Sequence, residues 1–217
     1  MKDFKIVWSA RSECGPNRKK NEDTIFPPIS GSSKPLFKAA VCDGLGGHVN
    51  GDVASKIAAD TLLKEITDLN QIITEANNNI LEYQEKNPSS LGMGTTMTAI
   101  SIDSDALMKI GHVGDSRCYV LSDRNLIKVT EDQNVPGYQN VLKQALGSNE
   151  KLNIQEVDFQ LQIGDVVFLC SDGLYNEVGE EYIKKKMQDG ISADTFVSEV
   201  LLLNPKDNVS AIVINLV

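Results

Sequence analysis

The sequence predicts an α+β fold in which antiparallel β-sheets pack together with α-helices on the outside. The predicted elements follow the order strands, two helices, many strands, two helices and a final strand. This order differs from the strict strand–helix alternation of a doubly wound parallel sheet. No Pro-, Gly- or Ser-rich linker is long enough to divide the chain, so residues 1–217 are predicted to form a single domain.

Seven segments are predicted to be strands. They are short, rich in Val, Ile, Thr and aromatic residues, and bounded by Gly, Asp, Ser or Pro. These segments are residues 4–8, 36–42, 95–102, 107–113, 118–121, 166–170 and 209–217. The Ser/Gly-rich residues 30–35 are predicted to be a loop between adjacent strands.

Four segments are predicted to be helices. In residues 52–66, Val53, Ile57 and Leu62 recur along one helical face. The other three are residues 69–85, 180–187 and 193–203. Each helix pair interrupts the series of strands, so the pairs are expected to cover the sheets.

Composition excludes several classes of protein. The formal net charge of −9 argues against nucleic acid or an anionic membrane as a partner, because a phosphate-rich surface does not attract an acidic chain. No apolar run reaches the roughly 20 residues of a membrane span, and the N-terminus has no signal-peptide pattern. Since the cysteines form no C-x-x-C pair, we expect reduced thiols and a cytoplasmic protein, with a disulfide framework as the alternative. The four cysteines are Cys14, Cys42, Cys118 and Cys170.

Acidic residues recur beside glycine at the ends of predicted strands. The segments are Asn21-Glu22-Asp23, Asp43-Gly44, Gly114-Asp115, Asp172-Gly173 and Asp207-Asn208. Any one Asp-Gly pair is explained more simply as a turn. Several carboxylates held together would repel one another unless cations neutralised them. Oxygen ligands without His or Cys select magnesium, manganese or calcium rather than zinc.

The glycine-rich stretch that begins at Gly44 raises a nucleotide-binding alternative. The dinucleotide fingerprint needs glycine at position 49, which is Val49, and the P-loop needs lysine at position 52, which is Asp52. Both patterns therefore fail. His112 lies within an apolar run and is predicted to be a hydrogen-bonded core residue, and Trp8 is also predicted to be core.

Taken in order, these motifs resemble the metal-dependent protein phosphatases of the protein phosphatase 2C type, in particular their bacterial branch. The resemblance covers almost the whole chain. Its motifs are Arg18-x-x-Asn21-Glu22-Asp23, Asp43-Gly44-Leu45-Gly46-Gly47-His48 with Gly51 and Ala54-Ser55, Met93-Gly94-Thr95-Thr96, Gly114-Asp115-Ser116-Arg117, Thr130-Glu131-Asp132, Ala145-Leu146-Gly147, Ser171-Asp172-Gly173-Leu174 and Asp207-Asn208.

The resemblance implies a central sandwich of two antiparallel β-sheets flanked by pairs of α-helices, and hydrolysis of phosphoserine and phosphothreonine in proteins. It implies two manganese or magnesium ions, with a weaker third in bacterial members. In the implied site, Asp43 bridges the two ions, Asp172 and Asp207 complete the ligands of one ion, and the Gly44 carbonyl with an acid of the Glu22–Asp23 pair (Asp23 favoured) holds the other. Asp115 and Asp172 hold the implied third ion. Arg18 is implied to bind the substrate phosphate.

The implied mechanism is attack on phosphorus by a hydroxide that bridges the two ions, without a phosphoenzyme. Phosphorylated proteins, the products of a serine/threonine kinase, are the implied partners, and we expect a monomer. A pseudophosphatase that acts as a binding module is the alternative, and it predicts lost metal ligands.

Three departures from the family pattern stand out. Leu45 occupies the position of a histidine in the eukaryotic branch, so a role for His48 as proton donor does not carry over, and Gln133 stands where a histidine is common. The flap, residues 131–144, is shorter than usual, and residues 138–146 are predicted to form at most a short helix. We therefore expect an open site and a loosely held third ion.

Overall fold

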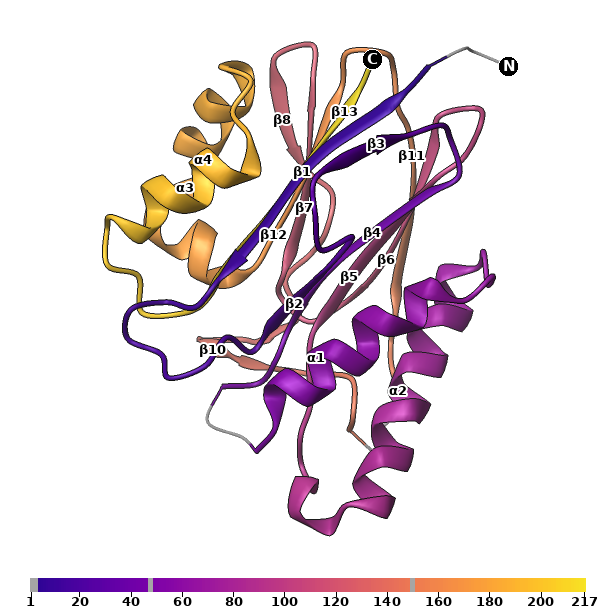
Figure 1. Cartoon of the computed structure of the whole chain (residues 1–217), viewed down its shortest axis with the longest axis vertical. Helices are drawn as coiled ribbons and strands as arrows, with labels where there is room; N and C mark the ends of the chain where they lie inside the picture. The colour runs from indigo at the N-terminus through magenta and orange to yellow at the C-terminus, as the bar shows by residue number, and fades with distance from the viewer. Residues whose placement is uncertain (1–3, 47–48, 149–150) are drawn as a thin grey trace.

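Two antiparallel β-sheets form the centre of the molecule (Figure 1). The computed structural model describes residues 4–46, 49–148 and 151–217. One sheet has the strand order β3-β1-β13-β12-β7-β8 and the other β11-β6-β5-β4-β2. The first contains β3 (Gly31–Ser33), β1 (Ile6–Glu13), β13 (Val209–Leu216), β12 (Val166–Cys170), β7 (Arg117–Ser122) and β8 (Asn125–Lys128). The second contains β11 (Gln155–Gln160), β6 (Leu107–Val113), β5 (Met97–Ile102), β4 (Phe37–Asp43) and β2 (Asp23–Phe26).

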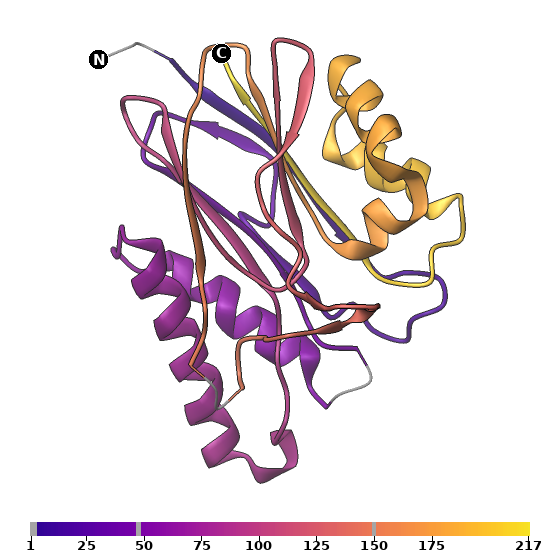
Figure 2. The same cartoon turned by 180° about the vertical axis from the view of Figure 1, so that it is seen from behind.

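A pair of helices covers the outer face of each sheet. Helices α1 (Gly51–Asp60) and α2 (Leu69–Lys86) pack on the five-stranded sheet, and α3 (Asp172–Gln188) and α4 (Ala193–Leu201) pack on the six-stranded sheet. Figure 2 shows the same layers from behind. The predicted α+β sandwich flanked by helix pairs is therefore confirmed.

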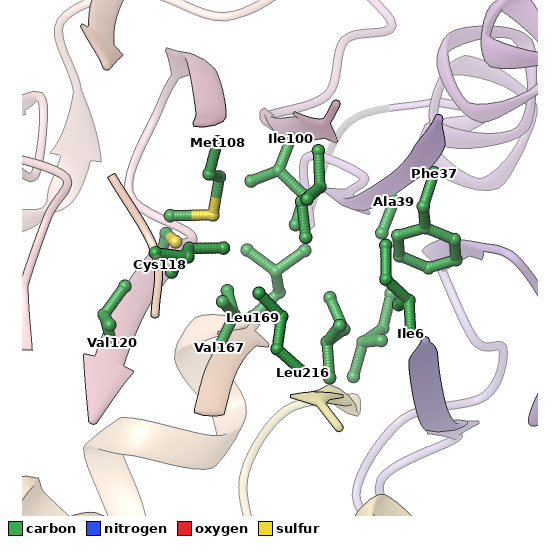
Figure 3. Packing of buried hydrophobic residues seen from close by; sticks show 14 of the residues in the cluster. Ile6, Phe37, Ala39, Ile100, Met108, Cys118, Val120, Val167, Leu169 and Leu216 are labelled. Carbon is green, nitrogen blue, oxygen red and sulfur yellow. The ribbon is translucent and has the colours of Figure 1, made fainter. Parts of the chain in front are cut away.

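The main apolar core lies between the two sheets, as Figure 3 shows. Side chains from both inner faces meet there, among them Ile6 and Leu169 from the first sheet and Ile100 from the second, all fully buried. Burial of one such side chain stabilises the fold by about 1.5–3 kcal/mol. This core fixes the two sheets against each other, so acids at their ends are held at fixed positions.

Several predicted boundaries are wrong. Helix α1 ends at Asp60, followed by a 3-10 turn at Thr61–Leu63, rather than at residue 66. Helix α3 begins at Asp172, eight residues before the predicted start, because the Asp-Gly pair opens a helix instead of a turn. Strand β3 lies inside the predicted loop 30–35, where it pairs with β1.

Residues 138–146 contain a strand and not the short helix that was predicted. Strand β10 (Tyr138–Leu142) pairs with β9 (Asn134–Val135) in a hairpin whose turn contains Pro136 and Gly137, and Gly137 has a φ of 83°. The turn brings the two short segments side by side, so strand pairing satisfies their backbone groups.

All four cysteines are free, and Cys42, Cys118 and Cys170 are buried in strands, as predicted. Trp8 is only partly buried, although its ring packs against Phe37 at the edge of the core. No helix among the described residues has the length and apolar character needed to cross a lipid bilayer.

Candidate active site

The acids of the five-stranded sheet meet at the ends of β2 and β4. Asp23 begins β2 and lies opposite Asp43, the last residue of β4. Thr96 receives a hydrogen bond from the Asp43 backbone N–H at 3.0 Å, and the Thr95 hydroxyl donates to the Asp43 carbonyl at 2.9 Å. The backbone of Asp43 is thus fixed on both sides by residues that precede β5.

Glycine at position 44 allows the chain to pass very close to its neighbours. A Cβ atom at Gly44 would lie 2.4 Å from the Gly51 carbonyl oxygen and 2.7 Å from that of Glu22. A Cβ at Gly51 would lie 2.9 Å from Oε1 of Glu22. Only residues without a side chain fit here, so the start of α1, the turn after β4 and Glu22 are packed together.

The acids of the six-stranded sheet arrive from β12 and β13. Asp172 lies two residues after the end of β12, with Ser171 between them, and Asp207 lies two residues before β13. A Cβ at Gly173 would lie 2.1 Å from the Asn208 carbonyl oxygen and 3.0 Å from Cβ of Asp207. The Asp172 and Asp207 segments are therefore in contact.

Arg18 joins the two groups of acids. Its Nη2 lies 2.5 Å from Oδ2 of Asp207, and its Nη1 lies 3.8 Å from Oε2 of Glu22. The neighbouring lysines differ: Lys19 is exposed, and Lys20 pairs with Asp52 at 2.5 Å. Of this basic run, Arg18 is the residue whose charge lies among the predicted site acids.

Burial and mutual repulsion make these carboxyls hard to ionise. Desolvation, and then the charges of Asp23 and Asp172, raise the pKa of Asp43 well above its ordinary value. Desolvation raises the pKa of Asp23 to about 6 against the hydrogen bonds from Ser210 and Ser171. Desolvation, followed by the charge of Asp115, raises the pKa of Asp172 to about 7. The site thus concentrates negative charge that only a nearby positive charge can balance.

Two oxygens of this cluster are buried without a hydrogen-bond partner, Oδ1 of Asp23 and Oδ1 of Asp172. A buried unpaired carboxylate oxygen is costly, and a hard divalent cation is the ligand that such oxygens prefer. Among residues 4–46, 49–148 and 151–217, no three His, Cys, Asp or Glu side chains converge as a ready-formed cation cage. The fit to a cation therefore rests on the two unpaired oxygens and on the all-oxygen donor set.

Asp115 lies at the edge of this cluster, in the turn between β6 and β7. Oδ2 of Asp115 accepts a hydrogen bond from Asn134 of β9 at 2.9 Å, and its carbonyl accepts one from the Tyr175 hydroxyl at 3.0 Å. Asp115 is thus held by the flap and by α3.

The base of the flap is tied down by Gln133. Its Oε1 accepts from the Gly114 N–H at 2.9 Å, and its backbone N–H donates to the Gly114 carbonyl. The buried His112 donates from Nε2 to the Glu131 carbonyl and accepts at Nδ1 from Thr98, which confirms the predicted hydrogen-bonded core residue. His48 lies outside the described residues.

Sequence reasoning missed the hydroxyls that support the acids. Ser210 donates to Oδ2 of Asp23 at 2.6 Å, and the Ser210 N–H donates to Oγ of Ser171. Ser171 entered the sequence analysis only as part of a motif, and Ser210 lies inside an apolar strand. The only available signals were that Ser171 adjoins Asp172 and that Ser210 lies three residues after Asp207.

Comparison with known proteins agrees with this arrangement. Residues 16–205 match the family model of protein phosphatase 2C. The serine/threonine phosphatase stp of Listeria monocytogenes is 31% identical, over 94% of this chain and 93% of its own length. The serine/threonine protein phosphatase PstP of Mycobacterium tuberculosis is 30% identical over 98% of this chain and 45% of its own length.

The structure is also similar to solved structures. The crystal structure of the PstP catalytic domain in complex with two manganese ions superposes with a TM-score of 0.86 at 29% identity, covering 99% of this chain and 100% of that chain. A crystal structure of the M. tuberculosis PstP gives a TM-score of 0.86 at 28% identity over 97% of this chain. The fold of this chain is therefore shared with these structures along nearly its whole length.

Proposed function

The chain belongs to the protein phosphatase 2C family and is an enzyme of the serine/threonine phosphatase class, and we propose that it hydrolyses phosphoserine and phosphothreonine in proteins in a reaction that requires divalent cations. The observation that carries this proposal is the cluster of Asp23, Asp43, Asp172 and Asp207 at one end of the sandwich. Two of its buried oxygens have no hydrogen-bond partner.

Each acid has a proposed role in holding cations. Asp43, Asp172 and Asp207 would hold one ion, and Asp43 with Asp23 or Glu22 and the Gly44 carbonyl would hold the other. Asp115 and Asp172 hold a weaker third ion. When bound, the ions supply a water of lowered pKa as the nucleophile and positive charge for the phosphate oxygens. The all-oxygen donor set favours manganese or magnesium.

The chain itself binds and orients the phosphate through Arg18. The planar guanidinium can donate two parallel hydrogen bonds to phosphate oxygens, which fixes their orientation and balances their charge. Its present contact with Asp207 keeps the guanidinium at the acid cluster. No side chain is proposed as the nucleophile, so we expect no phosphoenzyme.

Hydrolysis of an aryl phosphate with manganese, with and without chelator, tests this function. Asp43→Asn should lose at least about a thousandfold in activity, or ~4 kcal/mol of transition-state stabilisation. The same variant should bind manganese more weakly, seen as a smaller rise in melting temperature on addition of the ion. Asp103→Asn is the matched control, because Asp103 lies in the turn at the far end of β5.

A pseudophosphatase gives the opposite result, with no manganese-dependent turnover in the wild-type chain. Near-normal activity in folded Asp43→Asn protein would also contradict the proposed site. The family pattern favours an active enzyme, since an acid stands at every position where the motifs require one.

The remaining parts of the proposal concern the setting of the enzyme. We propose that residues 1–217 are one catalytic domain with a shortened flap at 131–144, that it acts as a monomer on phosphorylated proteins made by a serine/threonine kinase, and that it works in the cytoplasm. The four free thiols support a reducing compartment.

A further inference from the structure

The tyrosine on the first turn of α3 is bonded to the turn that carries Asp115. The Tyr175 hydroxyl donates to the Asp115 carbonyl at 3.0 Å, and both groups are buried. Tyr175 lies three residues after Asp172 on the same helix. This bond therefore connects the segment of one candidate cation ligand to the segment of another.

Strand pairing does not reach these two acids. Strands β7 and β12 are neighbours, and their ladder ends at the pair of Arg117 and Cys170. Asp115 lies two residues before Arg117, and Asp172 lies two residues after Cys170. Beyond the ladder, hydrogen bonds outside the sheet must set the spacing of the Asp115 and Asp172 segments. The Tyr175 hydroxyl makes one of these hydrogen bonds.

The ring of Tyr175 is itself held in place by Arg117. The guanidinium lies 3.5 Å from the ring centre, a distance at which a cation is attracted to the ring face. The same guanidinium makes a two-point ion pair with Asp132 at the start of the flap, at 3.0 Å and 2.6 Å, and donates to the Tyr119 hydroxyl at 2.9 Å. Its position is therefore fixed from three sides.

We propose that Tyr175 is a positioning residue that sets the distance between Asp115 and Asp172, and so the affinity of the cation these two acids share. Arg117 holds the ring of Tyr175 in place. Its pairing with Asp132 connects the base of the flap to this arrangement. The inference rests on the proposed function for the presence of a cation. It adds a residue that touches neither the cation nor the phosphate.

The chain offers a matched pair of variants. Tyr175→Phe removes the hydroxyl that reaches Asp115 and leaves the ring under Arg117. Tyr119→Phe removes the hydroxyl that accepts from the Arg117 guanidinium and donates to Glu180, and this hydroxyl does not reach Asp115. Tyr175→Phe loses one buried hydrogen bond and Tyr119→Phe loses two part-buried ones, so a purely structural role predicts that both variants weaken the protein to a similar degree.

Calorimetric titration with manganese of the whole chain separates the possibilities. We expect Tyr175→Phe to weaken the weakest binding step by about tenfold, the scale of losing a residue that orients a ligand, while the tighter steps keep their affinity. Tyr119→Phe should give the wild-type isotherm, because the two-point pair with Asp132 still holds Arg117 against the Tyr175 ring. In an Asp115→Ala background, Tyr175→Phe should have no further effect, because the two act through one site.

Three outcomes overturn the inference in distinguishable ways. A wild-type chain that binds no manganese overturns the proposed function and the inference together. A wild-type chain that binds manganese, with an unchanged isotherm for Tyr175→Phe, overturns the inference alone. Equal weakening by Tyr175→Phe and Tyr119→Phe also overturns it, because the effect is then one of general stability.

Discussion

Desolvation raises the pKa of Asp23, Asp43 and Asp172, so bringing these acids together is a cost to the fold. If the cluster served only to stabilise the fold, neutral side chains in its place would make the protein more stable, because uncompensated buried charges destabilise a folded protein. The uncompensated negative charge of the cluster instead favours the binding of positively charged groups. Arg18 supplies part of that charge from within the chain.

Arg18 should differ from its basic neighbours in function. Arg18→Ala removes the donors proposed for the substrate phosphate and should lower kcat/KM by roughly the 1.5–3 kcal/mol of a charge-assisted hydrogen bond. Lys19 is exposed and Lys20 pairs with Asp52, so alanine at either position should change little. Steady-state kinetics with one phosphopeptide measures all three.

Arg18→Lys is the control that separates charge from shape. The lysine can still pair with Asp207, but it lacks the planar fork. Equal, small effects for alanine at all three positions would show that the run is only a solvated loop.

His112 should make the fold less stable in acid. Burial lowers the pKa of His112 from 6.5 to about 4, against the hydrogen bond to the Glu131 carbonyl. Between these two values the unfolded chain takes up a proton that the folded chain does not, so stability falls as the pH falls. The loss between about pH 7.5 and about pH 5 should be about 2 kcal/mol.

His112→Gln isolates this contribution, because glutamine does not titrate. Urea unfolding of both proteins in chelator should give a free energy of unfolding that falls less with acid in the variant. The carboxylates titrate in both proteins and cancel in the comparison. Parallel pH profiles would rule out the buried neutral histidine as the cause.

Among the secondary-structure elements, α3 carries candidate site residues in its first turn and has an interruption of its helical backbone further along. Its first turn carries Asp172 and Tyr175, and Gly179 then interrupts it with a φ of 72° and a ψ of 167°. That conformation is open almost only to glycine. The break lets the first turn keep its place over the acids while the second part packs beside α4.

Gly179→Ala should therefore destabilise the protein by about 1–3 kcal/mol. A Cβ at this position meets no atom within 4 Å, so the cost is one of backbone conformation and not of packing. The midpoint of urea unfolding measures it. Glu181→Ala, an exposed change in the same helix, should stay within about 0.5 kcal/mol, and a similar value for Gly179→Ala would contradict the explanation.

The same helix shows where sequence reasoning reached its limit. Residues 107–113 and 166–170 were predicted as strands with their observed bounds, because their apolar runs end at clear turn residues. The start of α3 was missed because Gly179 interrupts the helical periodicity. Strand β11 was missed because it is an edge strand with an exposed polar face, and its pairing with β6 is a tertiary contact.

For the whole molecule, the sandwich brings acids from distant parts of the sequence to one end. Asp23 and Asp43 come from one sheet, and Asp172 and Asp207 come from the other. The sequence motifs predicted that these acids would lie together, since each lies at or beside the end of a strand. The supporting contacts of Thr96, Tyr175 and Ser210 could not be predicted, because they depend on how the layers pack.

We expect the flap to limit how much of a substrate this end of the molecule can contact. It consists of one hairpin, tied at its base where the Lys143 backbone N–H donates to the Gln133 carbonyl at 2.7 Å. Tyr138 and Val141 are exposed on it, 66% and 50% respectively. So small an element offers few contacts to residues that flank the phosphate, and binding energy from remote parts of a substrate contributes little to the reaction.

Short phosphopeptides of unrelated sequence should therefore be hydrolysed with kcat/KM values that span less than about a hundredfold, equivalent to about 2.7 kcal/mol. Replacing both Tyr138 and Val141 by alanine should narrow that span only slightly, because these are the exposed apolar side chains of the hairpin. A protein substrate should exceed the peptide cut from it if selectivity comes from docking elsewhere on the surface. If the kcat/KM values of the peptides spanned a wider range, and this range became narrow in the double variant, the flap would be the element that recognises the substrate. The site would then not be open.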